Sequence, residues 1–286
     1  MQNKIDSRLN QLARDGTLGD GTPCRMISDD DTMRLARETG LPGWQVEVRS
    51  LERNIQPDRY LRNRKSLSMS DQIRLLKAHV CIVGLGGLGG LVTESLARMG
   101  VGRLKLVDGD VFETHNLNRQ LLSSTDAVGM PKADVAAQRV ASIHPGIELT
   151  VVCENLTPSN AVDILNGCDL AVDCLDNIPS RFALASAAAE TAIPMVSAAV
   201  AGLSGHVTTL FPGGPGLEII YGPEDAHRAF TGEEIRLGCL APAVNLMASL
   251  ECVEVLKVLL DRPVTLKNRL LVVDLNDYAF ETLALS

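Results

Sequence analysis

The sequence is poor in aromatic residues, in positive charge and in paired cysteines. Phenylalanine, tryptophan and tyrosine make up 3% of its 286 residues, and the formal net charge is −8. A chain of this charge lacks the broad basic surface by which proteins hold nucleic acids or anionic membranes. We therefore predict no nucleic-acid partner and no membrane partner, and we expect a small, specific anion as the ligand instead.

Long apolar runs and cysteine motifs are also missing. No run approaches the ~20 residues of a membrane span, and residues 1–6 lack the apolar core of a signal peptide. We therefore expect a cytoplasmic protein. None of the seven cysteines forms a CxxC pair, and several lie inside apolar runs, so neither a disulfide framework nor a zinc knuckle is predicted.

What the sequence does contain is a glycine turn between an apolar run and a helix-like stretch. Gly84, Gly86, Gly87 and Gly89 follow the run at 80–83 and precede a helical pattern that reaches Met99. Glycines let backbone N–H groups approach phosphate oxygens, and the helix N-terminus adds roughly half a positive charge. The turn predicts a phosphate site. It fits NAD, FAD and other nucleotides equally well.

From Arg59 onward the pattern alternates between strands and helices, which is typical of a Rossmann-like, doubly wound α/β fold. We predict a mainly parallel sheet with antiparallel strands near the C-terminus. The expected strands are 79–83, 103–108, 148–153, 169–174, 193–198, 205–211 and 269–274; the expected helices are 88–99, 131–143, 158–166, 178–191 and 242–260.

Residues 1–57 differ from residues 58–286, the predicted catalytic domain. They are polar and lack strand-like runs, so we predict a small, mostly helical accessory arm with helices near 4–14 and 30–39, the second capped by Ser28. Trp44 should pack against the main body. Residues 212–238 form a connection too long for an ordinary loop, and we interpret them as a crossover segment or lid.

Acidic residues at the strand ends are the next candidates. If the first strands follow the order 3-2-1-4, Asp176 faces the glycine turn, where a carboxylate beside phosphates calls for a bridging Mg²⁺. Asp176 could instead cap the following helix or contact ribose. Asp108, about 20 residues beyond the turn, suits ribose hydroxyls of NAD or ATP alike, and Asp110 could contact nucleotide or shape the loop.

Two cations shift the balance toward ATP. Arg119 and Lys132 have no use in hydride transfer, whereas displacement of pyrophosphate from ATP requires neutralisation of charge on the triphosphate. Either side chain alone would more often be an ordinary surface residue. Their occurrence together with Asn116, Gln120 and Asp176 favours the catalytic interpretation.

Six sequence blocks, in this order and spacing, resemble the ThiF/MoeB/HesA family, the bacterial branch of the ubiquitin-activating-enzyme-like adenylyltransferases. They are RYLR at 59–62, GLGGLG at 84–89, the acids of VDGD at 108 and 110, NLNRQ at 116–120, GMPK at 129–132 and DCLDN at 173–177. The resemblance covers about residues 59–286. The N-terminal arm lies outside it.

The resemblance implies attack of a carboxylate on the α-phosphate of ATP, which gives an acyl-adenylate and pyrophosphate. The carboxylate is commonly the C-terminal Gly-Gly of a ubiquitin-like sulfur carrier protein, and a sulfur donor protein can follow as a partner. It also implies a role for each matching residue: the glycines hold phosphates, Asp108 holds the ribose, Asn116, Arg119 and Lys132 contact the triphosphate, Asp176 binds Mg²⁺ beside Asn177, and Arg62 reaches the neighbouring subunit's site in a homodimer.

Two departures from the family pattern matter. Many relatives carry zinc on two CxxC pairs, but residues 216–221 and the C-terminal stretch contain none here, so we predict no structural zinc. Some members also use a nucleophilic cysteine. Cys239, at a predicted helix start that can lower a thiol's pKa, is the candidate, and the alternative is a small residue that packs beneath the site.

Other functions remain open at this level. The chain could adenylate a peptide terminus or a small-molecule acid. An NAD-dependent oxidoreductase would share the glycine turn and Asp108 but would leave Arg119, Lys132 and Asp176 unexplained. A non-catalytic scaffold would not need these charged residues at all.

Overall fold

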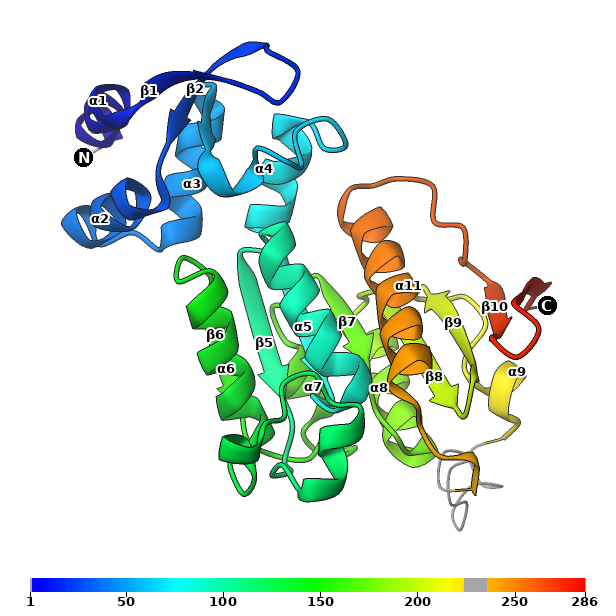
Figure 1. Ribbon diagram of the computed structural model, residues 1–286. Coiled ribbons are helices and arrows are strands. Elements are labelled where there is room, and N and C mark those ends of the chain that lie inside the picture. The colour runs from blue at the N-terminus through cyan, green and yellow to red at the C-terminus, as the bar shows by residue number, and fades with distance from the viewer. Residues whose placement is uncertain (1, 224–235, 286) are drawn as a thin grey trace.

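The computed structural model describes residues 2–223 and 236–285, and Figure 1 shows their arrangement. The N-terminal elements are α1 (Gln2–Leu12), β1 (Arg14–Thr17), β2 (Pro23–Ile27), α2 (Asp29–Thr39), α3 (Gly43–Glu52), β3 (Ile55–Pro57), η1 (Asp58–Tyr60) and α4 (Met69–Lys77). The remaining elements are β4 (His79–Val83), α5 (Gly87–Met99), β5 (Arg103–Val107), η2 (Thr114–Asn118), η3 (Thr125–Ala127), α6 (Lys132–Ile143), β6 (Glu148–Val152), α7 (Ala161–Leu165), β7 (Leu170–Asp173), α8 (Ile178–Glu190), β8 (Met195–Ala201), β9 (Ser204–Leu210), α9 (Glu218–Tyr221), α11 (Ala241–Leu259), β10 (Arg269–Asp274) and β11 (Ala279–Ala284).

Within these residues, eight strands form one sheet in the order β11-β10-β9-β8-β7-β4-β5-β6. Strands β6, β5, β4, β7 and β8 run parallel, and β9, β10 and β11 are added antiparallel. The predicted α/β fold with antiparallel C-terminal strands is confirmed. The order of β6, β5, β4 and β7 is the predicted 3-2-1-4, so the switch point lies between β4 and β7, where loops leave the strands in opposite directions.

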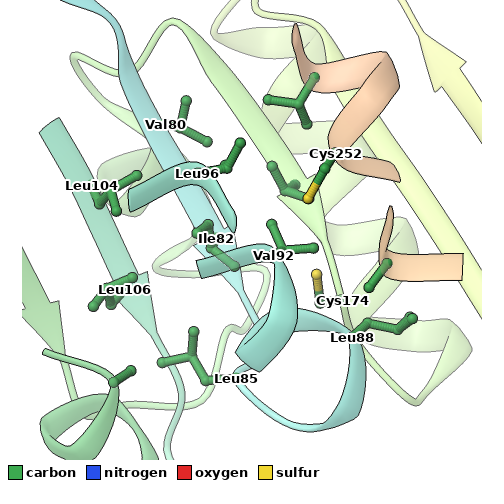
Figure 2. Packing of buried hydrophobic residues seen from close by; sticks show 14 of the residues in the cluster. Val80, Ile82, Leu85, Leu88, Val92, Leu96, Leu104, Leu106, Cys174 and Cys252 are labelled. Carbon is green, nitrogen blue, oxygen red and sulfur yellow. The ribbon is translucent and has the colours of Figure 1, made fainter. Parts of the chain in front are cut away.

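Helices cover both faces of the sheet because successive strand residues point to opposite sides. Val80 and Ile82 of β4 pack with α5 and α11 on one face, as Figure 2 shows from close by, whereas Cys81 and Val83 pack with α7 and α8 on the other. Strands that are apolar on both sides are typical of a buried parallel sheet. This core holds the strand ends, and the loops after them, in fixed positions.

The N-terminal arm contains more regular structure than the sequence suggested. The arm is mostly helical, as predicted, with α1, α2 and α3, but β1, β2 and β3 add a small sheet that the sequence did not predict. These strands have three to five residues each, too few to give a recognisable alternation in the sequence. The capping of α2 by Ser28 is confirmed, and Trp44 does contact the body: its Nε1 donates to Glu148 Oε2 at 3.2 Å, and Arg103 lies over its ring.

The arm lies at the amino ends of β5 and β6, whereas the glycine turn lies at the opposite, carboxyl end of the parallel strands (Figure 1). The predicted elements of the body match within a few residues, although the helix expected at 158–166 is shorter. The helices α4 and α9, the 3-10 helices and β11 were not predicted. Residues 224–235 of the predicted crossover segment lie outside the described part of the chain. None of the helices described combines the length and apolarity needed to cross a bilayer.

Candidate nucleotide-binding site

A cavity of about 950 Å³ lies at the carboxyl ends of β4, β5, β7 and β8. One half is formed by the glycine turn and by the loops after β4, β5 and β7. The other half is formed by the end of β8, the start of β9 and α9. Its position at the switch point of a parallel sheet is where α/β proteins bind ligands.

The four glycines of the turn have two different roles. At Gly84 and Gly89 a Cβ would lie 2.6 Å from Cys174 O and 1.8 Å from Gly84 O, respectively, so strand and helix could not approach each other with any side chain there. Gly86 and Gly87 line the cavity. Gly86 is the N-cap of α5 and supplies no side chain to bond the first-turn amides, so these donors remain for an anion.

Asp108 supports the turn from the end of β5. Its Oδ2 accepts from the Leu85 amide at 2.6 Å and its Oδ1 from the Asp110 amide at 2.8 Å. Burial raises the pKa of Asp108, although these two amides and Lys132 oppose the rise. A carboxylate can accept about four hydrogen bonds, so the remaining lone pairs can take ribose hydroxyls.

Lys132 is the buried cation of this half. Its Nζ lies 2.9 Å from Oδ2 of the exposed Asp110, and its amide donates to the Asp110 carbonyl at 2.9 Å. The side chain lines the cavity from the first residue of α6. An incoming phosphate would compete with Asp110 for this ammonium.

The loop at 115–120 brings two of its three predicted site residues to the cavity. Arg119 lies over the turn, where its Cγ is 3.9 Å from the position of a Cβ at Gly87. Gln120 is buried beside Gly86, and its Oε1 has no hydrogen-bond partner among the residues that the structure describes. Asn116 does not line the cavity, because it is buried in the loop and its Oδ1 accepts from the Glu113 amide. Its contact with triphosphate stays a prediction.

Asp176 and Asn177 follow β7 on the other side of the turn. Asn177, and not Asp176, is the N-cap of α8, since its Oδ1 accepts from the Ser180 amide at 2.9 Å. The capping alternative for Asp176 is therefore wrong. Asp176 is exposed at the cavity, with its Oδ1 3.3 Å from Asn177 Nδ2.

The residues of this half fit ATP and Mg²⁺. The glycine cradle leaves room for phosphate, the amides of α5 and two cations face it, and the Gln120 Nε2, a donor, is the atom nearest to a Cβ position at Gly86. Mg²⁺ usually takes one or two carboxylates and completes its shell with phosphate and water, which suits the exposed Asp176. No group of three or more histidine, cysteine, aspartate or glutamate side chains in residues 2–223 and 236–285 could hold a metal alone.

The other half of the cavity contains residues that the sequence analysis missed. Arg181 of α8 is buried and lines the cavity; its Nη1 lies 2.8 Å from Asp173 Oδ2 and 3.2 Å from Ser197 Oγ, and its Nη2 donates to Leu175 O. It thus ties β7, β8 and the loop that carries Asp176. The signal in the sequence was slight: Arg181 is the only charged residue at 178–189.

His206 and Tyr221 come from β9 and α9 and meet across the cavity wall, with His206 Nε2 3.0 Å from the Tyr221 hydroxyl. Burial, and then the charge of Arg181, lowers the pKa of His206 to about 4. Nearby, burial and Asp173 raise the pKa of Glu251 well above its usual range. Apart from Arg181, which is paired with Asp173, this half presents small and neutral groups to a ligand.

Cys239 and Arg62 occupy different places. Cys239 lines the cavity, with its Sγ 3.9 Å from Val200 O, but it precedes the N-cap Leu240 and so lies outside the first turn of α11. Arg62 is exposed beside Gly19 of the β1–β2 turn and does not line the cavity of its own chain.

Sequence comparisons agree with the geometry. The ThiF family profile matches residues 60–286. The SAMP-activating enzyme E1 of Haloferax volcanii is 36% identical over 229 residues, which is 79% of this chain and 84% of that protein. The vegetative HesA protein of Trichormus variabilis is 34% identical over 73% of this chain and 77% of its own length. The adenylyltransferase and sulfurtransferase MOCS3 of Danio rerio is 30% identical, and the chain spans about half of it (51%).

Solved structures share the fold. PaaA matches with a TM-score of 0.66 and 21% identity, over 89% of this chain and 90% of that one. Escherichia coli MccB, in its complex with ATP, matches with a TM-score of 0.67 and 23% identity, over 80% of this chain and 71% of that one.

Proposed function

The chain belongs to the ThiF family, and from this membership we propose that it is an ATP-dependent adenylyltransferase that activates the C-terminal Gly-Gly carboxylate of a ubiquitin-like carrier protein. The products are an acyl-adenylate and pyrophosphate. The activated carrier would then pass to sulfur transfer, with a sulfur donor protein as a further partner.

One observation carries this proposal: the phosphate cradle, two cations and the exposed carboxylate of Asp176 surround one cavity. Gly86 and Gly87 would receive the phosphates at the N-terminus of α5, and Lys132 and Arg119 would balance their charge. Asp176 would hold Mg²⁺. An oxidoreductase would need the cradle but neither the cations nor Asp176.

In the reaction, a carboxylate oxygen of the carrier attacks the α-phosphorus while the bond to the β-phosphate oxygen breaks. Lys132 and Arg119 stabilise the negative charge that passes to pyrophosphate, because fixed cations need no reorganisation as charge develops. Mg²⁺ on Asp176 would supply further neutralisation when bound. In the half formed by β8 and β9, the small residues Ala199, Ala201 and Gly205 line the cavity and leave room for the Gly-Gly tail of the carrier, which has no side chains. Adenylation itself does not need Cys239, whose role as a nucleophile in a later transfer step stays a prediction.

We also propose a homodimer in which Arg62 acts on the partner subunit's site. Arg62 is exposed at the end of the sheet away from its own cavity, so within one chain it cannot reach the phosphates. An arginine supplied by a second copy would neutralise charge as pyrophosphate leaves.

The test is Mg²⁺-dependent exchange of labelled pyrophosphate into ATP, with and without small ubiquitin-fold proteins that end in Gly-Gly. We expect exchange only with a carrier, and a loss of about 10²–10³-fold in Asp176→Ala. The matched control is Asp277→Ala, which removes an exposed carboxylate that does not line the cavity and should retain full exchange.

Three other outcomes would change the proposal. Exchange with a peptide or small acid, but with no carrier, would assign a different substrate to the same chemistry. Full exchange by Asp176→Ala would remove this residue from metal binding. Failure of the wild-type protein to bind ATP at all would refute the proposal that the chain is an ATP-dependent enzyme.

A further inference from the structure

A second group of ionisable side chains lies at the amino ends of the strands, away from the cavity. It consists of His79 and Cys81 on β4, Lys105 on β5, and Cys168 in the turn before β7. All lie on the α7 and α8 face of the sheet. The extended chain from His79 to Gly84, the first residue of the glycine turn, spans about 16 Å. The nucleotide site therefore uses none of them.

Cys168 and His79 form an oriented pair. The His79 Nδ1 lies 2.8 Å from Gly167 O, and because a carbonyl only accepts, Nδ1 carries a proton. That bond turns Nε2 toward Cys168 Sγ, 3.9 Å away. The arrangement of a thiol, an imidazole and a group that orients the imidazole is the one that activates nucleophiles.

The surroundings favour a negative sulfur. The Lys105 Nζ is buried and donates to Ile164 O at 2.6 Å and to Asn166 O at 3.2 Å, so a positive charge is fixed near the pair. A hydrogen bond from the Cys81 thiol, together with His79 and Lys105, outweighs burial and lowers the pKa of Cys168 to about 5. The bond to Cys168 in turn raises the pKa of His79.

We propose that Cys168 and His79 form a second reactive centre, at which hydrogen peroxide oxidises the Cys168 thiolate to a sulfenic acid. The sulfur attacks one peroxide oxygen, a new S–O bond forms, and the O–O bond breaks. Two electrons pass from sulfur to oxygen. The departing hydroxide takes the proton from the Nε2 of the His79 imidazolium and leaves as water.

The chain contains a matched control thiol. Cys153 is exposed, whereas Cys168 keeps only 7% of its surface, so access alone favours Cys153. The Sγ of Cys153 lies 3.7 Å from Asp134 Oδ1, and slight burial with this carboxylate raises its pKa. If thiolate content governs reactivity, Cys168 reacts faster than Cys153; if exposure governs it, Cys153 reacts faster.

The experiment treats the reduced, full-length protein with hydrogen peroxide at pH 6 in the presence of dimedone, and maps adducts by peptide mass spectrometry. We expect the adduct on Cys168 at least about tenfold faster than on Cys153, since thiolate content sets the rate. Cys153→Ser should leave the Cys168 adduct unchanged, and Cys168→Ser should abolish it. No nucleotide is needed, so the outcome is independent of the proposed function.

A pH profile shows whether His79 activates the Cys168 thiol or only packs against it. With iodoacetamide, Cys168 in the wild-type protein should react along a titration centred near its pKa of about 5. His79→Gln, which can still donate to Gly167 O, should move that midpoint upward and slow the reaction at pH 6 by about tenfold. Preferential labelling of Cys153, or an unchanged profile in His79→Gln, would overturn the proposal.

Discussion

The two halves of the cavity hold their charged residues in opposite ways. In the half around the glycine turn, Arg119 and Asp176 are on loops that follow strand ends, and Lys132 pairs with the exposed Asp110. In the half around β7, β8 and β9, Asp173 and Arg181 are buried against each other, and His206 is held neutral. The charged groups of the first half are available to a ligand. Those of the second half are buried and paired with each other, so they stabilise the fold.

This difference predicts different failures. We call the half around the glycine turn the loop half and the half around β7, β8 and β9 the strand half. Substitution in the loop half should reduce activity and leave stability nearly intact, because partly solvated ion pairs contribute little to folding. Substitution in the strand half should reduce stability first, because a buried charge without its partner is costly. Activity and the free energy of unfolding, measured on the same variants, therefore test whether the two halves differ in this way.

The largest effect is expected for Arg181→Met. The change leaves the Asp173 carboxylate buried without its cation, and Leu175 O without a donor. We expect a loss of roughly 3–5 kcal/mol in the free energy of unfolding, measured by urea denaturation. The double variant Arg181→Met/Asp173→Leu should recover part of that loss, since the lone charge is gone. A single variant as stable as wild type would mean that the halves do not differ.

Lys132→Ala comes next and should affect activity instead. Loss of this cation should lower the rate of pyrophosphate exchange by about 10²–10³-fold, as expected when one charged group that stabilises a leaving phosphate is removed. The free energy of unfolding should fall by no more than about 1 kcal/mol. Asp110→Ala is the matched control, because it removes the exposed partner and leaves the ammonium. A large loss of stability in Lys132→Ala would assign this lysine to the fold.

The loop half could be predicted from sequence because its signals are local. A glycine turn between a strand and a helix, and acids directly after strands, are contiguous patterns, and the parallel topology then brings them together. Asn116 is the exception: its side chain caps its own loop, and no local pattern distinguishes that from a ligand contact.

The strand half could not be predicted in the same way. His206 and Tyr221 meet only because β9 turns back antiparallel and α9 packs over it, and neither stands in a motif. The small sheet of the N-terminal arm was missed for a related reason. The strand β1 is Arg-Asp-Gly-Thr, of which only threonine favours strands, so its conformation depends on pairing with β2.

Ala201→Leu tests the smooth surface of the strand half. Ala201 ends β8 and lines the cavity, so a larger side chain would occupy space that we assign to the carrier tail. We expect the KM for the carrier to rise by about tenfold, equivalent to about 1.4 kcal/mol, while ATP binding stays unchanged. Ala185→Leu, on the partly buried face of α8 away from the cavity, controls for overpacking. Equal effects on carrier and ATP would contradict the division into two halves.

The last effect concerns His206 and pH. Above its ordinary pKa of 6.5, this histidine is neutral in both folded and unfolded chains and has no pH-dependent effect on stability. As the pH falls from 6.5 toward about 4, the unfolded chain takes up a proton that the folded chain does not, so stability must decrease across that window. His206→Gln keeps a side chain that can bond the Tyr221 hydroxyl but cannot titrate. Its free energy of unfolding should therefore fall less steeply than that of wild type between pH 6.5 and 4, and equal slopes would show that burial does not keep His206 neutral.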